Sequence, residues 1–127
     1  PPPEDSPMLE YARRRTARFQ RRLGEAGVEL AILTDQSSIA YLAGFWGYLS
    51  VEFGRPTFLL LRPDAAPLVI TPLMESEMVS AMTWVDNIAT WEDAGAKRWE
   101  HVLADAIEDG LATGKTRGGL LGRLERR

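Results

Sequence analysis

The sequence contains no cysteine and a single histidine, His101, among its 127 residues. The absence of cysteine excludes a disulfide-stabilised scaffold, a zinc site built from thiolates and catalysis by a thiol nucleophile. Long hydrophobic runs are absent as well, since the longest, such as Phe58–Leu61, fall far short of the ~20 residues that a membrane span requires. No charged-then-apolar secretory segment opens the chain, so we expect a cytoplasmic protein with no membrane contact.

An excess of positive charge is also missing, because the formal net charge is −3, with 45% hydrophobic and 26% charged residues. These proportions are typical of one globular domain. An acidic chain argues against nucleic acid as a partner, since binding to a phosphate backbone calls for a basic domain. The chain begins at Pro1 rather than at methionine and ends at Arg127, so we expect it to be a segment of a longer protein.

The sequence also lacks a group of side chains that could together form a metal site or a serine-nucleophile site. A lone imidazole completes a three-ligand metal site only with two carboxylates beside it. The dense carboxylate pairs are Glu75 with Glu77 and Glu92 with Asp93. Side chains two positions apart on a helix diverge by about 200°, which separates the first pair, and the second pair follows a predicted strand as caps. No serine stands in a Gly-x-Ser-x-Gly elbow. We therefore expect no catalytic residue, metal or cofactor in this chain.

The chain opens with a proline-rich, acidic stretch at 1–7, for which we expect disorder. Apolar residues then recur at intervals of three and four, which predicts a helix over 8–26. Ser6 stands at the N-cap position, Pro7 suits the first helical position, and Gly27 can take the left-handed conformation after the last turn.

Apolar runs and turn residues predict alternating strands and helices over the rest of the chain. We expect strands at 30–33, 56–61, 67–71 and 85–91, and helices at 39–43, 73–82 and 96–112. The continuous apolar run at 30–33 is typical of a strand covered on both faces. Pro63–Ala66 forms a turn that pairs the second and third strands as an antiparallel hairpin. The order predicts an α/β fold with a mixed β-sheet flanked by helices.

Arginine is concentrated in the first helix, at positions 13, 14, 15, 18, 21 and 22. A surface that binds nucleic acid would place aromatic stacking residues among such cations, whereas the one aromatic residue between them, Phe19, belongs to the apolar face of the helix. We interpret the arginines as a solvated face that pairs with acidic groups of this chain or of a domain outside it.

Aromatic residues are concentrated between positions 41 and 58, where Phe45–Gly54 has no regular period and is expected to form a loop holding one short edge strand. The aromatic residues are Tyr41, Phe45, Trp46, Tyr48, Phe53 and Phe58. The loop ends in Phe53-Gly54-Arg55-Pro56, and a guanidinium binds a carboxylate with two parallel hydrogen bonds while aromatic faces enclose the attached group. The composition supports a second interpretation of this loop equally well: a hydrophobic loop folded over the sheet edge, in which Arg55 pairs with Glu52 or Asp35.

The segment Ile39-Ala40-Tyr41-Leu42-Ala43-Gly44-Phe45, preceded by the arginine-rich helix, resembles the N-terminal domain of the creatinase / aminopeptidase P / prolidase family. The resemblance continues through the hairpin and Ile70-Thr71-Pro72 to about Ile107. It implies a ribonuclease-H-like α/β domain over 8–115. Residues 116–127 would then be a truncated tail or the stub of a further strand.

The resemblance also implies a parent hydrolase, of creatinase or Xaa-Pro peptidase type, that cleaves C–N bonds. In that family a C-terminal "pita-bread" domain binds a pair of divalent metals (Mn, Zn or Co) through Asp, His and Glu ligands. Nothing in this sequence corresponds to that domain, so we expect the isolated chain to be inactive. The resemblance further implies a homodimer in which this domain assists substrate binding in its partner.

Creatinase-like members carry Phe-Gly-Arg in this loop, which reaches the substrate carboxylate in the neighbouring subunit. By that likeness Arg55 would hold the carboxylate of a small substrate and Phe53 would form a hydrophobic wall. Trp46 and Tyr48 flank them as further candidates for substrate binding. The alternative is a free-standing interaction domain that binds another protein through the aromatic 41–58 loop or the basic first helix.

Overall fold

The structure is a computed structural model that describes residues 6–47, 49 and 54–113, with side chains as far as residue 109. Residues 1–5 of the expected lead-in, Tyr48 and Phe53 of the aromatic loop, and the tail at 116–127 lie outside this part of the chain. The chain divides into two compact units, Pro1–Trp91 and Glu92–Arg127.

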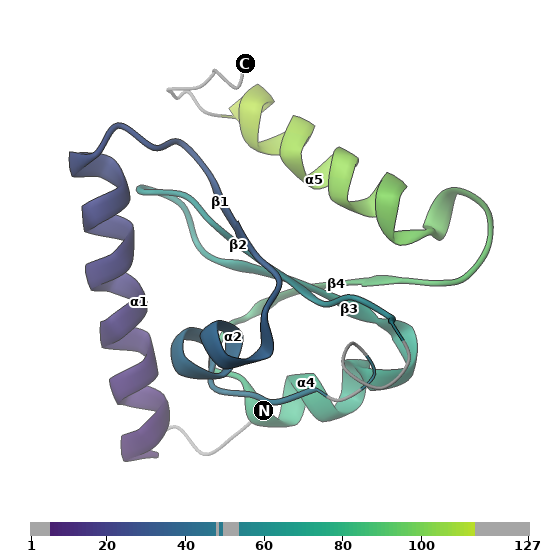
Figure 1. The fold of residues 1–127 in the computed structure, drawn as a ribbon, viewed down its shortest axis with the longest axis horizontal. Coiled ribbons are helices and arrows are strands. Elements are labelled where there is room, and N and C mark those ends of the chain that lie inside the picture. The colour runs from purple at the N-terminus through teal and green to yellow at the C-terminus, as the bar shows by residue number, and fades with distance from the viewer. Residues whose placement is uncertain (1–5, 48, 50–53, 114–127) are drawn as a thin grey trace. The chain divides into compact units, whose positions relative to one another are not determined.

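In its described residues, the first unit contains a four-stranded sheet and the α-helices that flank it (Figure 1). Its elements are α1 (Pro7–Glu25), β1 (Ala31–Leu33), α2 (Gln36–Ala43), β2 (Phe58–Leu61), β3 (Leu68–Pro72), the 3₁₀ turn η1 (Leu73–Glu75), α4 (Ser76–Met82) and β4 (Asn87–Trp91). The second unit contains the 3₁₀ turn η2 (Gly95–Lys97) and helix α5 (Trp99–Thr113).

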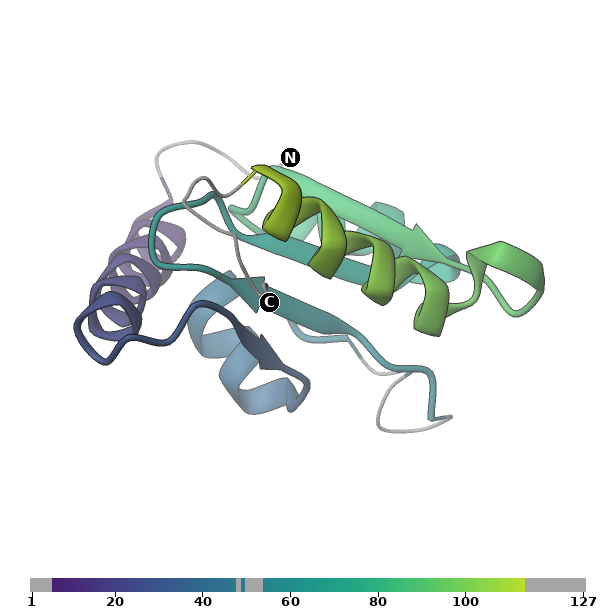
Figure 2. The ribbon, with the colours of Figure 1, turned by 90° about the horizontal axis from the view of Figure 1, so that it is seen from above.

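The strands follow the order β1-β2-β3-β4 across a mixed sheet (Figure 2). β1 and β2 pair antiparallel, as do β2 and β3, whereas β3 and β4 run parallel. The predicted hairpin is confirmed, with Leu59 opposite Val69. β1 is an edge strand and its Ile32 side chain is exposed, so the prediction that this run is covered on both faces was wrong.

Helix α1 begins at Pro7, one residue before the predicted start. Ser6 occupies the N-cap position, but its side chain makes no capping hydrogen bond. Gly27 takes the predicted left-handed conformation (φ 73°), and the amide of Val28 donates to the carbonyl of Leu23 at 2.8 Å. The helix therefore ends as its sequence indicates, through a glycine that needs no Cβ.

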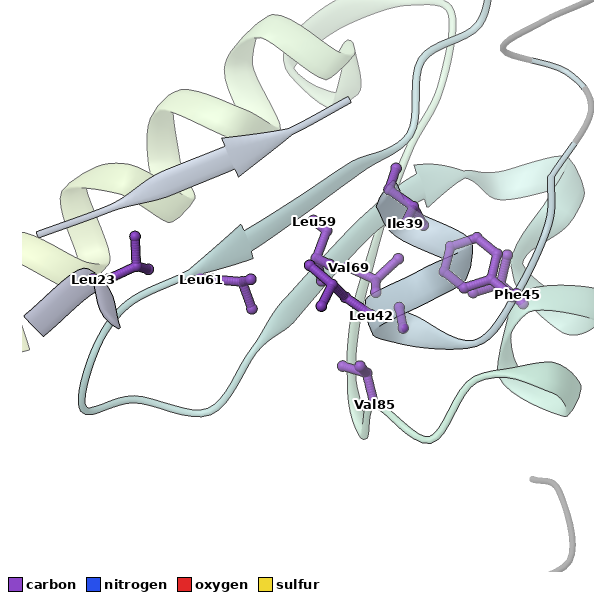
Figure 3. Packing of buried hydrophobic residues seen from close by; sticks show 10 residues of the cluster. Leu23, Ile39, Leu42, Phe45, Leu59, Leu61, Val69 and Val85 are labelled. Carbon is purple, nitrogen blue, oxygen red and sulfur yellow. The ribbon is translucent and has the colours of Figure 1, made fainter. Parts of the chain in front are cut away.

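The hydrophobic core lies between the sheet and helices α1, α2 and α4 (Figure 3). Its buried members are Leu23, Ile39, Leu42, Ala43, Phe45, Leu59, Leu61, Val69, Val79 and Val85. The odd-numbered residues of β2 and β3 point to this face because side chains alternate along a strand. Phe45 lies in the expected loop and is buried beside α2.

The last carbonyl groups of α2 all receive hydrogen bonds, three of them from side chains of other elements. The amide of Gly44 donates to Ala40, and Arg15 donates to the carbonyl of Tyr41 at 2.7 and 2.9 Å. The Leu42 carbonyl accepts from the Thr16 hydroxyl and the Trp84 indole, and the Ala43 carbonyl accepts from the Thr83 hydroxyl. A helix end leaves four such groups without intrahelical partners, so this end is fully satisfied.

The start of α2 carries a pH-dependent contribution to stability. The Asp35 carboxylate accepts the Ser38 amide at 2.9 Å, and this backbone hydrogen bond lowers the pKa of Asp35. A lowered pKa in the folded state stabilises the fold above the ordinary aspartate value of about 3.9 and loses that contribution as pH falls through the folded pKa. We expect Asp35→Asn, which keeps an acceptor, to flatten the acid limb of a stability-against-pH curve; an unchanged limb would contradict the assignment.

Candidate functional site

The segment that follows α2 combines a buried aromatic side chain with an exposed one. Gly44 has φ of 85°, a left-handed conformation that turns the chain, and a Cβ there would lie 2.6 Å from Leu9 Cδ2. The turn directs Phe45 into the core with 1% of its surface exposed, while Trp46 is 51% exposed. Phe45 thus fixes the start of the loop and Trp46 is presented to solvent.

Two buried polar side chains hold the backbone of this loop. The Gly47 amide donates to Gln36 Oε1 at 3.2 Å, and the Leu49 amide donates to Glu75 Oε2 at 3.3 Å. Gln36 is the first residue of α2 and Glu75 the last residue of η1, with 7% and 4% of their surfaces exposed. The described part of the loop is therefore attached to the scaffold by side chains.

Gly47 has a steric reason to be glycine. A Cβ at this position would lie 3.1 Å from Glu75 Oε1 and 3.3 Å from Oε2, tighter than ordinary van der Waals contact. The carboxylate of Glu75 therefore lies directly against the loop backbone, where a larger residue would displace it.

Arg55 lies at the far end of the same loop and is half-buried. Its amide donates to the Leu49 carbonyl at 3.2 Å. Gly54 before it has φ of 65°, and the Trp91 indole at the end of β4 donates to the Pro56 carbonyl at 2.8 Å. Since Pro56 biases the preceding residue toward extended conformations, Arg55 is restrained from both sides.

The structure places only part of the predicted site. Trp46 and Arg55 lie on the described parts of one loop, whereas Tyr48 and Phe53 lie outside the described residues. No strand occurs among the described residues of 45–54, and Leu49 is helical, so the edge strand expected there is not seen in this part. The carboxylate of Asp35, proposed as a partner of Arg55, instead caps α2.

The sequence analysis missed the residues that hold the loop: Gln36, Glu75 and Trp91. Glu75 was considered only as one of two helical carboxylates. Instead, η1 occupies Leu73–Glu75 and α4 begins at Ser76, so the helix expected over 73–82 starts as a 3₁₀ turn. The available signal was Pro72 followed by two apolar residues and Glu75, which resembles a helix start and conceals a buried carboxylate.

The other candidate groups do not form a second site. His101 is exposed on α5, and Glu92 forms an ion pair with Lys97 at 3.6 Å. Within the described part of the chain, no three His, Asp or Glu side chains are grouped so as to hold a metal ion. None of the described helices is long and apolar enough to cross a membrane. These residues therefore do not fit a divalent metal pair.

The basic face of α1 makes contacts within the chain along its first half. Glu10 forms ion pairs with Arg13 at 3.6 Å and Arg14 at 3.2 Å. The Arg13 guanidinium lies 4.9 Å from the centroid of the Trp84 ring, and that of Arg15 lies 4.1 Å from the Tyr41 ring. The arginines of this half thus stabilise the packing of α1 against its neighbours.

Comparison with known proteins places this geometry in a family. Residues 15–119 match the family described as Creatinase/Prolidase N-terminal domain. The agropine synthesis cyclase of Rhizobium rhizogenes is 29% identical over 110 residues, which cover 85% of this chain and 26% of that protein. The chain thus spans about a quarter of the length of this curated relative.

Solved structures share the fold. The creatinase/prolidase N-terminal domain of an X-Pro dipeptidase from Streptococcus pyogenes is 27% identical with a TM-score of 0.61, covering 72% of this chain and 70% of that one. A prolidase from Thermococcus sibiricus is 23% identical with a TM-score of 0.65, covering 77% of this chain and 25% of that one. The mixed sheet flanked by helices is the expected fold, and the match over residues 15–119 shows that this chain belongs to the creatinase/prolidase N-terminal domain family.

Proposed function

We propose that this chain is the N-terminal, non-catalytic domain of a creatinase- or Xaa-Pro-peptidase-like metallohydrolase. In this role it assists dimerisation and contributes Arg55 and its aromatic neighbours to substrate binding in a partner subunit's active site. Family membership supports the proposal, since members carry a C-terminal catalytic domain. The matched residues cover only 26% of the agropine synthesis cyclase, so the rest of that relative is long enough to contain such a domain.

The observation that carries the proposal is the anchored loop, which has an exposed Trp46 near its start and the restrained Arg55 at its end. A loop that only covered a sheet edge would bury its aromatic residues, whereas Trp46 is half-exposed. A guanidinium suits a small substrate with a carboxylate, because its planar fork matches that group. The loop therefore offers one aromatic and one guanidinium side chain to a ligand that carries a carboxylate.

Exposed apolar side chains near the loop support the homodimer. Leu73 and Met74 stand on η1 next to Glu75, which contacts the loop, and both are exposed. With Trp46 they give this end of the unit an apolar surface of the kind that protein interfaces bury. The partner that this proposal requires is a second copy of the parent, whose active site the loop would enter.

The divalent metal pair (Mn, Zn or Co) would belong to the parent's C-terminal pita-bread domain, because the described residues of this chain do not fit it. There it would activate water for attack on a C–N bond. The isolated chain would show no turnover, and the parent is proposed to be cytoplasmic.

The test is Arg55→Ala in the full-length parent, assayed with manganese or zinc against creatine and Xaa-Pro dipeptides. A hydrogen bond to a charged group contributes about 1.5–3 kcal/mol, so we expect KM to rise about 10- to 100-fold for the carboxylate substrate. Arg18→Ala, which removes an exposed arginine of α1, should leave KM unchanged. An unchanged KM in Arg55→Ala would remove the carboxylate-binding role, and hydrolysis by the isolated chain would show that it has its own catalytic site.

The second candidate is a free-standing interaction domain, which the exposure of Trp46 and of Arg18, Arg21 and Arg22 favours. Sedimentation of the chain with a candidate protein distinguishes the two. Binding that Trp46→Ala abolishes, without any effect of Arg55→Ala on KM in the parent, would favour the interaction domain.

A further inference from the structure

We propose that Glu75 is a positioning residue, which acts with Gln36 and Trp91 to set the place of Arg55 and Trp46 without touching the substrate. This inference rests on the proposed function, because it assigns to the scaffold the placement of the loop that binds the carboxylate. Neither the sequence pattern nor the family resemblance singled out these three residues.

A connected series of hydrogen bonds links Glu75 to Arg55. Glu75 Oε2 accepts the amide of Leu49, and the carbonyl of the same Leu49 accepts the amide of Arg55. Leu49 thus transmits the position of the carboxylate to the backbone of Arg55. If Glu75 moved, the Leu49 amide would lose its acceptor, and the Leu49 carbonyl, which binds Arg55, would be free to shift.

The other two side chains hold the loop on either side of this series. Gln36 Oε1 binds the Gly47 amide next to Trp46, and Trp91 Nε1 binds the Pro56 carbonyl next to Arg55. The three residues belong to α2, η1 and β4, so each attachment comes from a different element of the scaffold. Three separate attachments fix both the position and the orientation of a short loop.

The burial of Glu75 favours this role over general stabilisation. A buried carboxylate is costly unless hydrogen bonds compensate for lost hydration, and an aliphatic side chain of similar volume is often as stable. The carboxylate also lies within van der Waals reach of Gly47, where a Cβ would crowd both of its oxygens. What the charged group provides, and an aliphatic one cannot, is an acceptor for the loop amide.

The consequence for ligand binding is large because a hydrogen bond between a guanidinium and a carboxylate requires a donor–acceptor distance of about 2.7–2.9 Å. A displaced Arg55 would lose this geometry even though Glu75 does not touch the substrate. Loss of one such charge-assisted bond weakens binding about 10-fold or more, so we expect Glu75→Ala in the full-length parent to raise KM for the carboxylate substrate by that factor. Because the catalytic domain is untouched, kcat should change less than KM.

Matched variants separate positioning from loss of fold. Glu75→Gln keeps an oxygen acceptor for the Leu49 amide and should restore KM toward that of the unchanged protein. Glu77→Ala removes an exposed carboxylate two residues away and should have no effect. Trp91→Phe keeps a buried aromatic ring, loses the donor to Pro56 and leaves a small cavity, so it should raise KM even if Glu75→Ala fails to fold.

Hydrogen exchange in the same parent variants gives a readout independent of activity. In Glu75→Ala the amides of Leu49 and Arg55 should exchange faster, while those of Val69 and Ile70 in β3 stay protected. Equal acceleration in β3 would show a structural role only, and unchanged exchange at Leu49 and Arg55 would overturn the proposal.

The kinetic outcomes distinguish this inference from the proposed function. If Arg55→Ala raises KM and neither Glu75→Ala nor Trp91→Phe does, the positioning role is wrong while the proposed function stands. If Arg55→Ala leaves KM unchanged, the proposed function fails, and the exchange at Leu49 and Arg55 alone decides whether Glu75 holds the loop.

Discussion

Replacing Phe45 by alanine is expected to lower the free energy of unfolding by about 3–5 kcal/mol, the range for a large aromatic side chain removed from a packed core. Phe45 is 1% exposed and packs in the cluster between α2, α4 and the sheet (Figure 3). Its removal loses apolar burial and leaves a cavity that rigid neighbours fill only in part. Urea unfolding followed by far-UV circular dichroism would measure the change as a lower midpoint with an unchanged slope.

The adjacent residue provides the control. Trp46 is of the same chemical type but half-exposed, so Trp46→Ala should change stability by less than about 1 kcal/mol. Phe45→Leu, which leaves a smaller cavity, should fall between the two and remains measurable if Phe45→Ala is unfolded. Similar losses for Phe45→Ala and Trp46→Ala would mean that the turn at Gly44 does not direct the two side chains as described.

Replacing Thr83 by valine is expected to lower the free energy of unfolding by about 2–6 kcal/mol, because it leaves two buried backbone groups unpaired at about 1–3 kcal/mol each. The Thr83 hydroxyl donates to the Ala43 carbonyl and accepts the Val85 amide at 3.1 Å. Valine has nearly the same shape, so the change removes the hydrogen bonds and little else. Thermal unfolding of both proteins would measure the loss.

Thr71 is the matched control for Thr83. It is fully buried, yet its hydroxyl has no hydrogen-bond partner in the described structure. Thr71→Val therefore removes an unsatisfied polar group and should be neutral or stabilising, and Thr83→Ser should retain most of the stability. Equal losses in Thr71→Val and Thr83→Val would show that shape and not hydrogen bonding determines the effect at both positions.

The sheet and the hairpin could be predicted because their signals are local. The apolar runs around Pro63–Ala66 are bounded by turn residues, and the pattern fixes both the strands and their antiparallel pairing. The C-terminus of α1 at Gly27 is likewise specified by a single residue type. Helix α2 begins at Gln36 and not at Ile39 because Asp35 caps it, a local signal that the spacing of apolar residues does not contain.

The candidate site was predictable only in its exposed residues. Trp46 and Arg55 could be named because aromatic and guanidinium groups in a glycine-rich loop suggest binding. Glu75 could not, because its burial depends on a 3₁₀ turn that places it against Gly47, a residue distant in sequence. The side chains that bind the loop backbone follow no periodic pattern in the sequence, since each belongs to a different helix, turn or strand.

The satisfied C-terminal end of α2 has a consequence for the order of assembly. Its carbonyl groups accept hydrogen bonds from Arg15 and Thr16, which precede α2 in the sequence, and from Thr83 and Trp84, which follow it by about 40 residues. Contacts of such long sequence separation form slowly, so the final turn of α2 should be completed only late in folding. A chain that ends before Thr83 would accordingly lack two of the side-chain donors to the last turn of α2, so the loop that begins beyond Gly44 would reach its final place last.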